Sequence, residues 1–76
     1  MDINRIISKL DNNFKLVFEN NKVNIVNFTK LGIFDDNKVV LYNGIDMIII
    51  KGKKLVISKL LTDEILIEGL IDNIQL

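Results

Sequence analysis

Short apolar runs fill the chain from residue 14 onward, and in the runs at 14–18 and 64–68 side chains alternate with the period of two that is typical of half-buried β-strands. The apolar runs lie at 14–18, 23–28, 31–34, 38–42, 46–51, 55–58, 64–68 and 70–76. Short polar turns separate the runs, and the sequence contains no proline that would interrupt them. This spacing predicts an all-β domain of about seven to eight short strands, folded as a small antiparallel sandwich or roll.

The turns between these runs carry their own signals. Asn20 and Asn21 tolerate positive φ and predict a tight hairpin, and residues 35–37 (Asp-Asp-Asn) predict a second turn. Asn43-Gly44 is typical of a type I′ hairpin. Gly52 and Gly69 each end an apolar run, so we interpret both as structural turns, together with Asn43 and Gly44.

One internal similarity suggests an alternative architecture. Residues 48–52 (Ile-Ile-Ile-Lys-Gly) align with residues 65–69 (Ile-Leu-Ile-Glu-Gly) at an offset of 17. Such an offset fits one coil of a β-solenoid, but a solenoid needs about three repeats to bury a core. A β-solenoid-like stack therefore remains the second choice.

The first residues follow a different period. Ile3, Ile6, Ile7 and Leu10 fall on one face of a helix, with Asp2 as N-cap. We expect a short amphipathic helix within residues 1–12 and a single β domain over residues 13–76. The apolar face of this helix, with Tyr42, is the candidate interaction surface.

Composition supports an interacting protein. The chain has 76 residues, of which 49% are hydrophobic. So short a chain buries only about 60% of its unfolded surface, and apolar surface that stays uncovered marks interfaces. We therefore expect a homo-oligomer or a complex with another protein.

Charge and residue types argue against most other functions. Ten basic and ten acidic residues cancel and are interspersed, unlike the clustered charge of nucleic-acid binders. A small nucleic-acid-binding barrel that uses Lys51, Lys53, Lys54 and Lys59 is the alternative function. With no cysteine and no histidine, thiolate metal sites and the usual general base are excluded.

The acidic pairs Asp35-Asp36 and Asp63-Glu64 could in principle hold a metal or transfer protons, but both sit where a turn meets a strand, and turn formation explains them. We expect no enzymatic activity, no metal and no cofactor. No signal peptide and no apolar run long enough to cross a bilayer are visible, so we expect a cytoplasmic chain.

The C-terminal pattern supports a resemblance. Ile48-x-Ile50-x-Gly52-x-x-Leu55-x-Ile57, followed by Asp63-Glu64-Ile65-x-Ile67-x-Gly69-x-Ile71-x-x-Ile74, resembles the YabP/YqfC family of sporulation proteins. Residues 62–71 make the YqfC branch the most similar. The resemblance covers roughly residues 14–76 and contains no catalytic signature. This chain has Asn21 where the family often has a histidine.

The resemblance implies a small mother-cell protein of endospore-forming bacteria that is needed for spore formation. Family members are often encoded beside an integral membrane protein, YabQ or YqfD, which is taken to be the partner. It therefore implies an assembly or interaction module of the cytoplasm that a partner can hold at a membrane.

Overall fold

The computed structural model of the protein describes residues 13–76, which form one β-sheet. Its strands are β1 (Lys15–Glu19), β2 (Lys22–Val26), β3 (Lys30–Phe34), β4 (Lys38–Asn43), β5 (Asp46–Leu60) and β6 (Glu64–Gln75). Their order in the sheet is β1-β2-β6-β5-β4-β3, and every neighbouring pair is antiparallel. The expected all-β fold is confirmed. The expected helix, with Ile3, Ile6, Ile7 and Leu10, lies outside the described residues.

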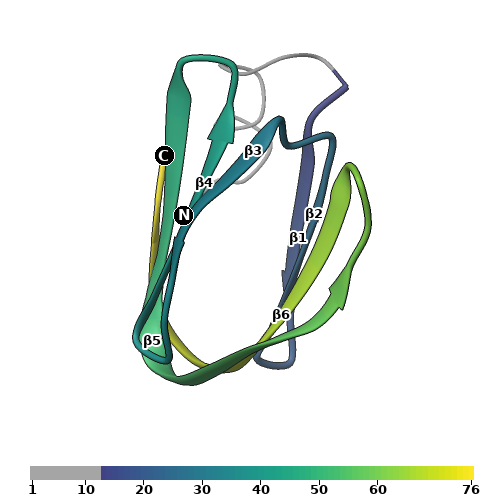
Figure 1. The fold of residues 1–76 in the computed structure, drawn as a ribbon. Coiled ribbons are helices and arrows are strands. Elements are labelled where there is room, and N and C mark those ends of the chain that lie inside the picture. The colour runs from purple at the N-terminus through teal and green to yellow at the C-terminus, as the bar shows by residue number, and fades with distance from the viewer. Residues whose placement is uncertain (1–12) are drawn as a thin grey trace.

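The sheet is bent because β5 and β6, with 15 and 12 residues, are long enough to belong to two parts of it (Figure 1). The β1–β2 half contains β1, β2, residues 64–68 of β6 and residues 56–60 of β5. The β3–β4 half contains β3, β4, residues 46–52 of β5 and residues 70–75 of β6. Figure 1 shows the two halves diverging from the bend and facing each other.

The core fills the space between the two halves. Both contribute to one buried cluster: Phe14, Leu16, Val23, Ile25, Phe28, Val39, Leu41, Ile48, Ile50, Leu55, Ile65, Ile67 and Ile74. Because side chains alternate between the two faces of a strand, the direct neighbours of these positions within a strand point outward. Ile65 and Ile67 are fully buried while Glu64, Leu66 and Glu68 are half-buried, as the alternation predicts.

Three expectations need correction. The described residues form six strands in one continuous sheet, so neither seven to eight strands nor two separate sheets are present there. The runs at 46–51 and 55–58 belong to the single strand β5, and the last two runs belong to β6. The solenoid-like alternative is wrong, because coils of a solenoid pair in parallel and all these strands pair antiparallel.

Gly52 and Gly69 are therefore not turns but points where β5 and β6 bend across each other. A Cβ at Gly52 would collide with the carbonyl oxygen of Leu70. Gly69 has φ +144°, and a Cβ there would lie 2.8 Å from the carbonyl oxygen of Lys54. Only glycine allows the two backbones to approach so closely, and the strand register shifts beside both positions.

Each bend is held by the turn of a neighbouring hairpin. The backbone N–H of Gly69 donates to the carbonyl oxygen of Asn21 (3.2 Å), and that of Gly52 donates to the carbonyl oxygen of Asn37 (3.0 Å). Asn20 and Asn21 have φ values of 51° and 60°, which confirms the predicted tight hairpin and fits a type I′ turn. The two turns thus anchor the sheet where it changes direction.

The predicted hairpin at Asn43-Gly44 is present but displaced by one residue. Asn43 is the last residue of β4 and pairs with Asp46, so the two-residue loop is Gly44-Ile45. Positive φ occurs at Gly44 (62°) and not at Ile45, which fits a type II′ turn better than type I′. The Asn43 side chain is buried and donates to the carbonyl oxygen of Asn27.

The two halves repeat one arrangement about the β5–β6 contact. In the β1–β2 half a hairpin pairs with the first part of β6, and in the β3–β4 half a hairpin pairs with the first part of β5. The register is equivalent: Val23 lies opposite Ile67 as Val39 lies opposite Ile50. The similarity between residues 48–52 and 65–69 therefore reflects two equivalent bent strands rather than successive coils.

Candidate interaction surface

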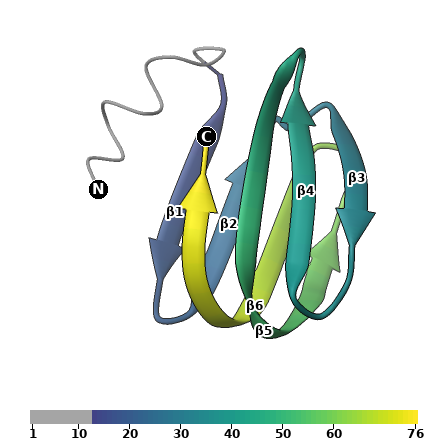
Figure 2. The same ribbon diagram turned by 90° about the vertical axis from the view of Figure 1, so that its left-hand side faces the viewer.

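The outer side of the β3–β4 half is apolar along its middle, and Figure 2 looks onto this half. Across the β4–β5 pair, Tyr42 lies opposite Met47, Val40 opposite Ile49, and Lys38 opposite Lys51. We call these six residues the β4–β5 face. Val40 is only 3% exposed although it is not part of the core cluster, whereas Met47 is 47% exposed.

Tyr42 is the described residue of the predicted interaction surface, and it lies at one end of this face. It pairs with Lys30 of β3, whose Nζ is 5.9 Å from the centroid of the tyrosine ring. The ring also covers Gly32, where an added Cβ would lie 2.9 Å from its Cε2 atom. Tyr42 is thus half-buried and held in place from the β3 side.

The other end of the face carries unpaired positive charge. Lys38 and Lys51 occupy directly opposed positions on β4 and β5. Neither is ion-paired with any residue in the part of the chain that the structure describes. Like charges at directly opposed positions of an antiparallel pair are destabilising.

The equivalent outer surface of the other half is polar and internally paired. Its six positions, which we call the β2–β6 face, are Lys22, Asn24, Val26, Glu64, Leu66 and Glu68. Lys22 Nζ lies 3.8 Å from a Glu68 carboxylate oxygen, and Asn24 Nδ2 donates to Glu64 Oε2 at 3.2 Å. Lys59 and Ser58 of β5 add an ion pair to Glu64 (3.6 Å) and a hydrogen bond to Glu68.

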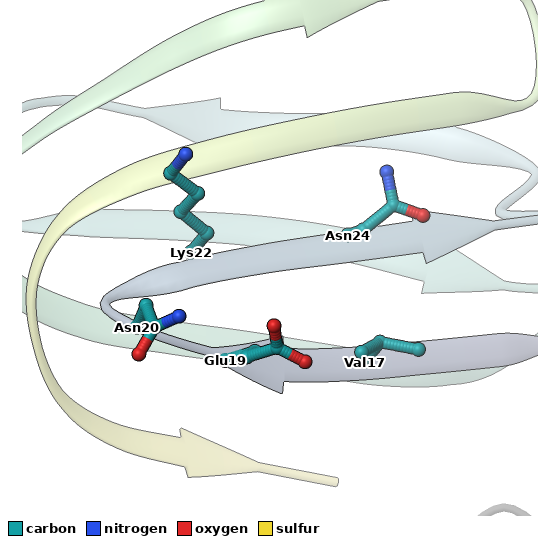
Figure 3. A pocket seen from close by; sticks show the side chains of 5 residues that line it. All are labelled: Val17, Glu19, Asn20, Lys22 and Asn24. Atoms are coloured by element: carbon teal, nitrogen blue, oxygen red, sulfur yellow. The ribbon is translucent and has the colours of Figure 1, made fainter.

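A shallow depression borders the β2–β6 face. It is lined by Val17, Glu19, Asn20, Lys22 and Asn24 of the β1–β2 hairpin. Figure 3 shows these side chains, which come from both strands and the turn. Its polar side chains are one carboxylate, one amine and two amides.

The acidic residues singled out in the sequence have structural partners. Asp35 Oδ1 accepts a hydrogen bond from the backbone N–H of Asn37 (2.8 Å), which closes the β3–β4 turn. The carbonyl oxygen of Asp63 accepts from the N–H of Asn27, and Glu64 is ion-paired with Lys59. Among the described residues no three metal-ligating side chains lie close enough together to hold an ion.

The lysines proposed for nucleic-acid binding are spread along β5. Lys51 precedes the bend on the β4–β5 face, while Lys59 follows it and pairs with Glu64. Lys53 and Lys54 lie at the bend itself, where Lys54 has φ 55°. The four lysines are therefore divided between the two sides of the bend, and one of them is already ion-paired.

The outer apolar face was missed in the sequence, although its signal was present. Residues 39–41 and 48–50 are apolar at every position, so both sides of these strands are apolar. The sequence pattern instead placed the candidate interaction surface on the N-terminal helix and Tyr42. The register of β4 with β5 shows which residues of each run point outward. Within residues 13–76 no helix is long and apolar enough to span a bilayer.

The comparisons with known proteins agree with the resemblance seen in the sequence. No curated protein matches the chain. A sequence model of the YabP family matches residues 10–76, which is most of the chain, although it does not distinguish the YqfC branch. The match contains all six strands and both bend glycines. The chain therefore belongs to the YabP family.

Proposed function

We propose that the protein is a non-enzymatic interaction module of sporulation and that the β4–β5 face is its contact surface. Membership of the YabP family indicates a sporulation-associated protein. The observation that carries the assignment of the surface is the outward apolar row of Val40, Ile49 and Met47 on strands whose opposite sides already form the core.

The layout of this face matches that of protein interfaces, which have an apolar centre and a polar rim. Met47 and the half-buried Ile49 form the accessible apolar part beside the buried Val40, Tyr42 extends it, and lysines stand at both ends. Tyrosine and methionine are enriched at interfaces relative to the remaining surface. The β2–β6 face, built on an equivalent frame, has the ion pairs of a hydrated surface instead.

The partner in this proposal is an integral membrane protein of sporulation, or a second copy of the chain, in the mother-cell cytoplasm. Such a partner would hold the protein at a membrane. A second copy has the exposed edge of β3 available to it, where Ile33 and Phe34 are 59% and 48% exposed. An unpaired apolar edge strand is a template for pairing with another chain.

The test compares one substitution on each outer face. Met47→Glu and Val17→Glu introduce the same charge at apolar positions with similar exposure, 47% and 40%. We expect both variants to fold, since neither residue belongs to the core cluster. Sporulation of a strain that carries only the variant protein should fall with Met47→Glu and stay normal with Val17→Glu.

The same pair of variants is then assayed for assembly. Light scattering after gel filtration measures self-association, and co-purification measures binding to the membrane protein encoded beside the gene. Met47→Glu should weaken whichever association the unmodified protein shows. Normal sporulation and unchanged association in a folded Met47→Glu variant would overturn the proposed contact surface.

A further inference from the structure

We infer that the β4–β5 face binds an acidic amphipathic helix of a partner protein, with an apolar stripe that has carboxylates toward both ends. This inference rests on the proposed function and specifies the chemistry of the partner. Three independent features of the face lead to it: its charge, the spacing of its charged ends, and the position of β4 and β5 inside the sheet.

The two charged side chains of the face are both lysines, and neither of them is ion-paired with another of the described residues. Lys38 and Lys51 stand at one end, and Lys30 stands at the other beside Tyr42. The β6 positions that pair with the outward residues of β5 are Asn73 and Gln75, which are neutral. A partner's carboxylate between Lys38 and Lys51 would offset the repulsion between the two lysines. On the other half, Glu68 already supplies a carboxylate to Lys22.

The spacing sets the distance between the partner's carboxylates. Tyr42 and Lys38 are four residues apart on β4, which corresponds to about 13 Å along a strand. The same distance is spanned by about nine residues of an α-helix. The apolar residues of such a helix would cover Met47 and Ile49 between its charged ends.

The position of the strands favours a helix over an added strand. β4 is hydrogen-bonded to β3 and β5, and the first part of β5 is hydrogen-bonded to β4 and β6. Their backbone groups have no hydrogen bonds left for a peptide strand. A helix satisfies its own backbone and contributes only side chains, which is how helices cover one face of an antiparallel sheet.

The structure argues against two other occupants. A second copy docked through the same face would bring lysines against lysines, and the glutamates of the β2–β6 face are already paired with Lys22 and Lys59. An anionic lipid surface is bound by clusters of about four to eight basic residues. The face has two lysines, with Lys30 of β3 beside it, and Met47 is its most exposed apolar side chain.

The test uses three synthetic helical peptides with one apolar stripe and either glutamate, glutamine or lysine toward both ends. Tyr42 is the only tyrosine and the chain has no tryptophan, so tyrosine fluorescence reports from this face. At low ionic strength the glutamate peptide should bind most tightly and the lysine peptide should not bind. Added salt should weaken the binding, because exposed charges are screened within about 10 Å at 0.1 M salt.

Two variants with the same change in net charge locate the binding. Lys51→Glu should weaken the glutamate peptide about tenfold, which corresponds to about 1.4 kcal/mol. Lys15→Glu, on the exposed outer side of β1 in the other half, should leave the affinity unchanged. Equal weakening by both variants, or equal affinity for all three peptides, would overturn the inference.

Two further measurements test whether the face binds lipid or a second copy of the chain instead. A tyrosine signal that responds to phosphatidylglycerol vesicles but to none of the peptides would assign the face to lipid. A signal that changes with protein concentration alone would assign it to a second copy. Either result overturns the acidic helix and leaves the proposed function intact if Met47→Glu still abolishes sporulation. Normal sporulation of that variant defeats the proposed function itself.

Discussion

The two halves of the bent sheet have equivalent frames and equivalent inner sides but different outer sides. Val23 and Ile67 face the core from one half as Val39 and Ile50 do from the other. Outward, however, the ion pair of Lys22 and Glu68 is replaced by the like-charged pair of Lys38 and Lys51. The inner positions of both halves must be apolar because they form the core. The outer positions are not constrained in this way, so a difference between the two outer sides points to function.

The divergence continues at the middle of each face, where the β2 and β4 positions differ while the β6 and β5 positions are apolar in both. The β2–β6 face has Asn24 opposite Leu66 where the β4–β5 face has Val40 opposite Ile49. Exposed ion pairs such as Lys22–Glu68 contribute only about 0.2–1 kcal/mol each. The polar face is therefore not a major source of stability, and the apolar face is not needed to complete the core. We therefore attribute the difference between the two outer faces to what each face contacts.

The largest effect is expected for charges placed on the inner side of either half. Ile67→Asp and Ile50→Asp would each put an unpaired carboxylate at a fully buried position. Because a domain of this size is stable by only about 4–11 kcal/mol, both variants should be unfolded by circular dichroism. Val17→Asp, at an exposed position, serves as the control and should fold. A folded variant of either isoleucine would refute the equivalence of the inner sides.

The next largest loss of stability is expected at the bend, where β5 and β6 approach each other and the two halves of the sheet separate. Gly52→Ala should lower the free energy of unfolding by about 3 kcal/mol or more, the range of severe backbone and packing defects. The reason is that its Cβ collides with the backbone of Leu70, which cannot move without breaking the β5–β6 pairing. Urea denaturation measures the loss.

Gly44→Ala is the matched control for this substitution. Unlike Gly52, Gly44 has positive φ (62°), but nothing lies within 4 Å of an added Cβ there. Its loss should be limited to the backbone conformation, about 1–2 kcal/mol. If the two alanine variants were equally stable, the close approach at Gly52 would not be what bends the sheet.

Much of the fold could be predicted because it depends on local patterns. Alternation located the strands, and Asn20-Asn21 located a hairpin whose two positive φ values the structure confirms. Gly52 and Gly69 were misread because a glycine after an apolar run has the same local signature in a turn and in a bend. The choice between them depends on Leu70 and Lys54, which approach from the other strand.

The candidate surface was harder to predict for a related reason. The sequence shows that residues 39–41 and 48–50 are apolar on both sides, but not which side is covered. Which side of these strands is covered depends on how the sheet bends, because the bend brings the other half of the sheet against one side only. Burial of Val40 outside the core cluster becomes visible only in the folded chain. The predicted helical part of the surface falls outside the described residues.

A smaller effect is expected when one face is given the charge pattern of the other. Glu68→Lys places a lysine opposite Lys22 and so reproduces the arrangement of Lys38 and Lys51. It also removes the acceptor of the Ser58 hydroxyl. The free energy of unfolding should fall by about 0.5–1 kcal/mol, and the loss should shrink in high salt. A loss that is independent of salt would show that the charge is not its cause.

The smallest effect is the reverse exchange, Lys51→Glu. It places a carboxylate opposite Lys38 and should raise the free energy of unfolding by about 0.5 kcal/mol, measured by urea denaturation at low and high salt. Lys15→Glu, which has no opposed charge at its partner Val26, should change stability less. A gain in stability would mean that lysine at position 51 is the less favourable residue for the isolated fold. Its presence is then explained by what the face binds, and a partner's carboxylate supplies the charge that Glu68 supplies on the other half. If Lys51→Glu gave no gain, Lys38 and Lys51 would be too well hydrated to repel each other, and the electrostatic case for an acidic partner would fail with it.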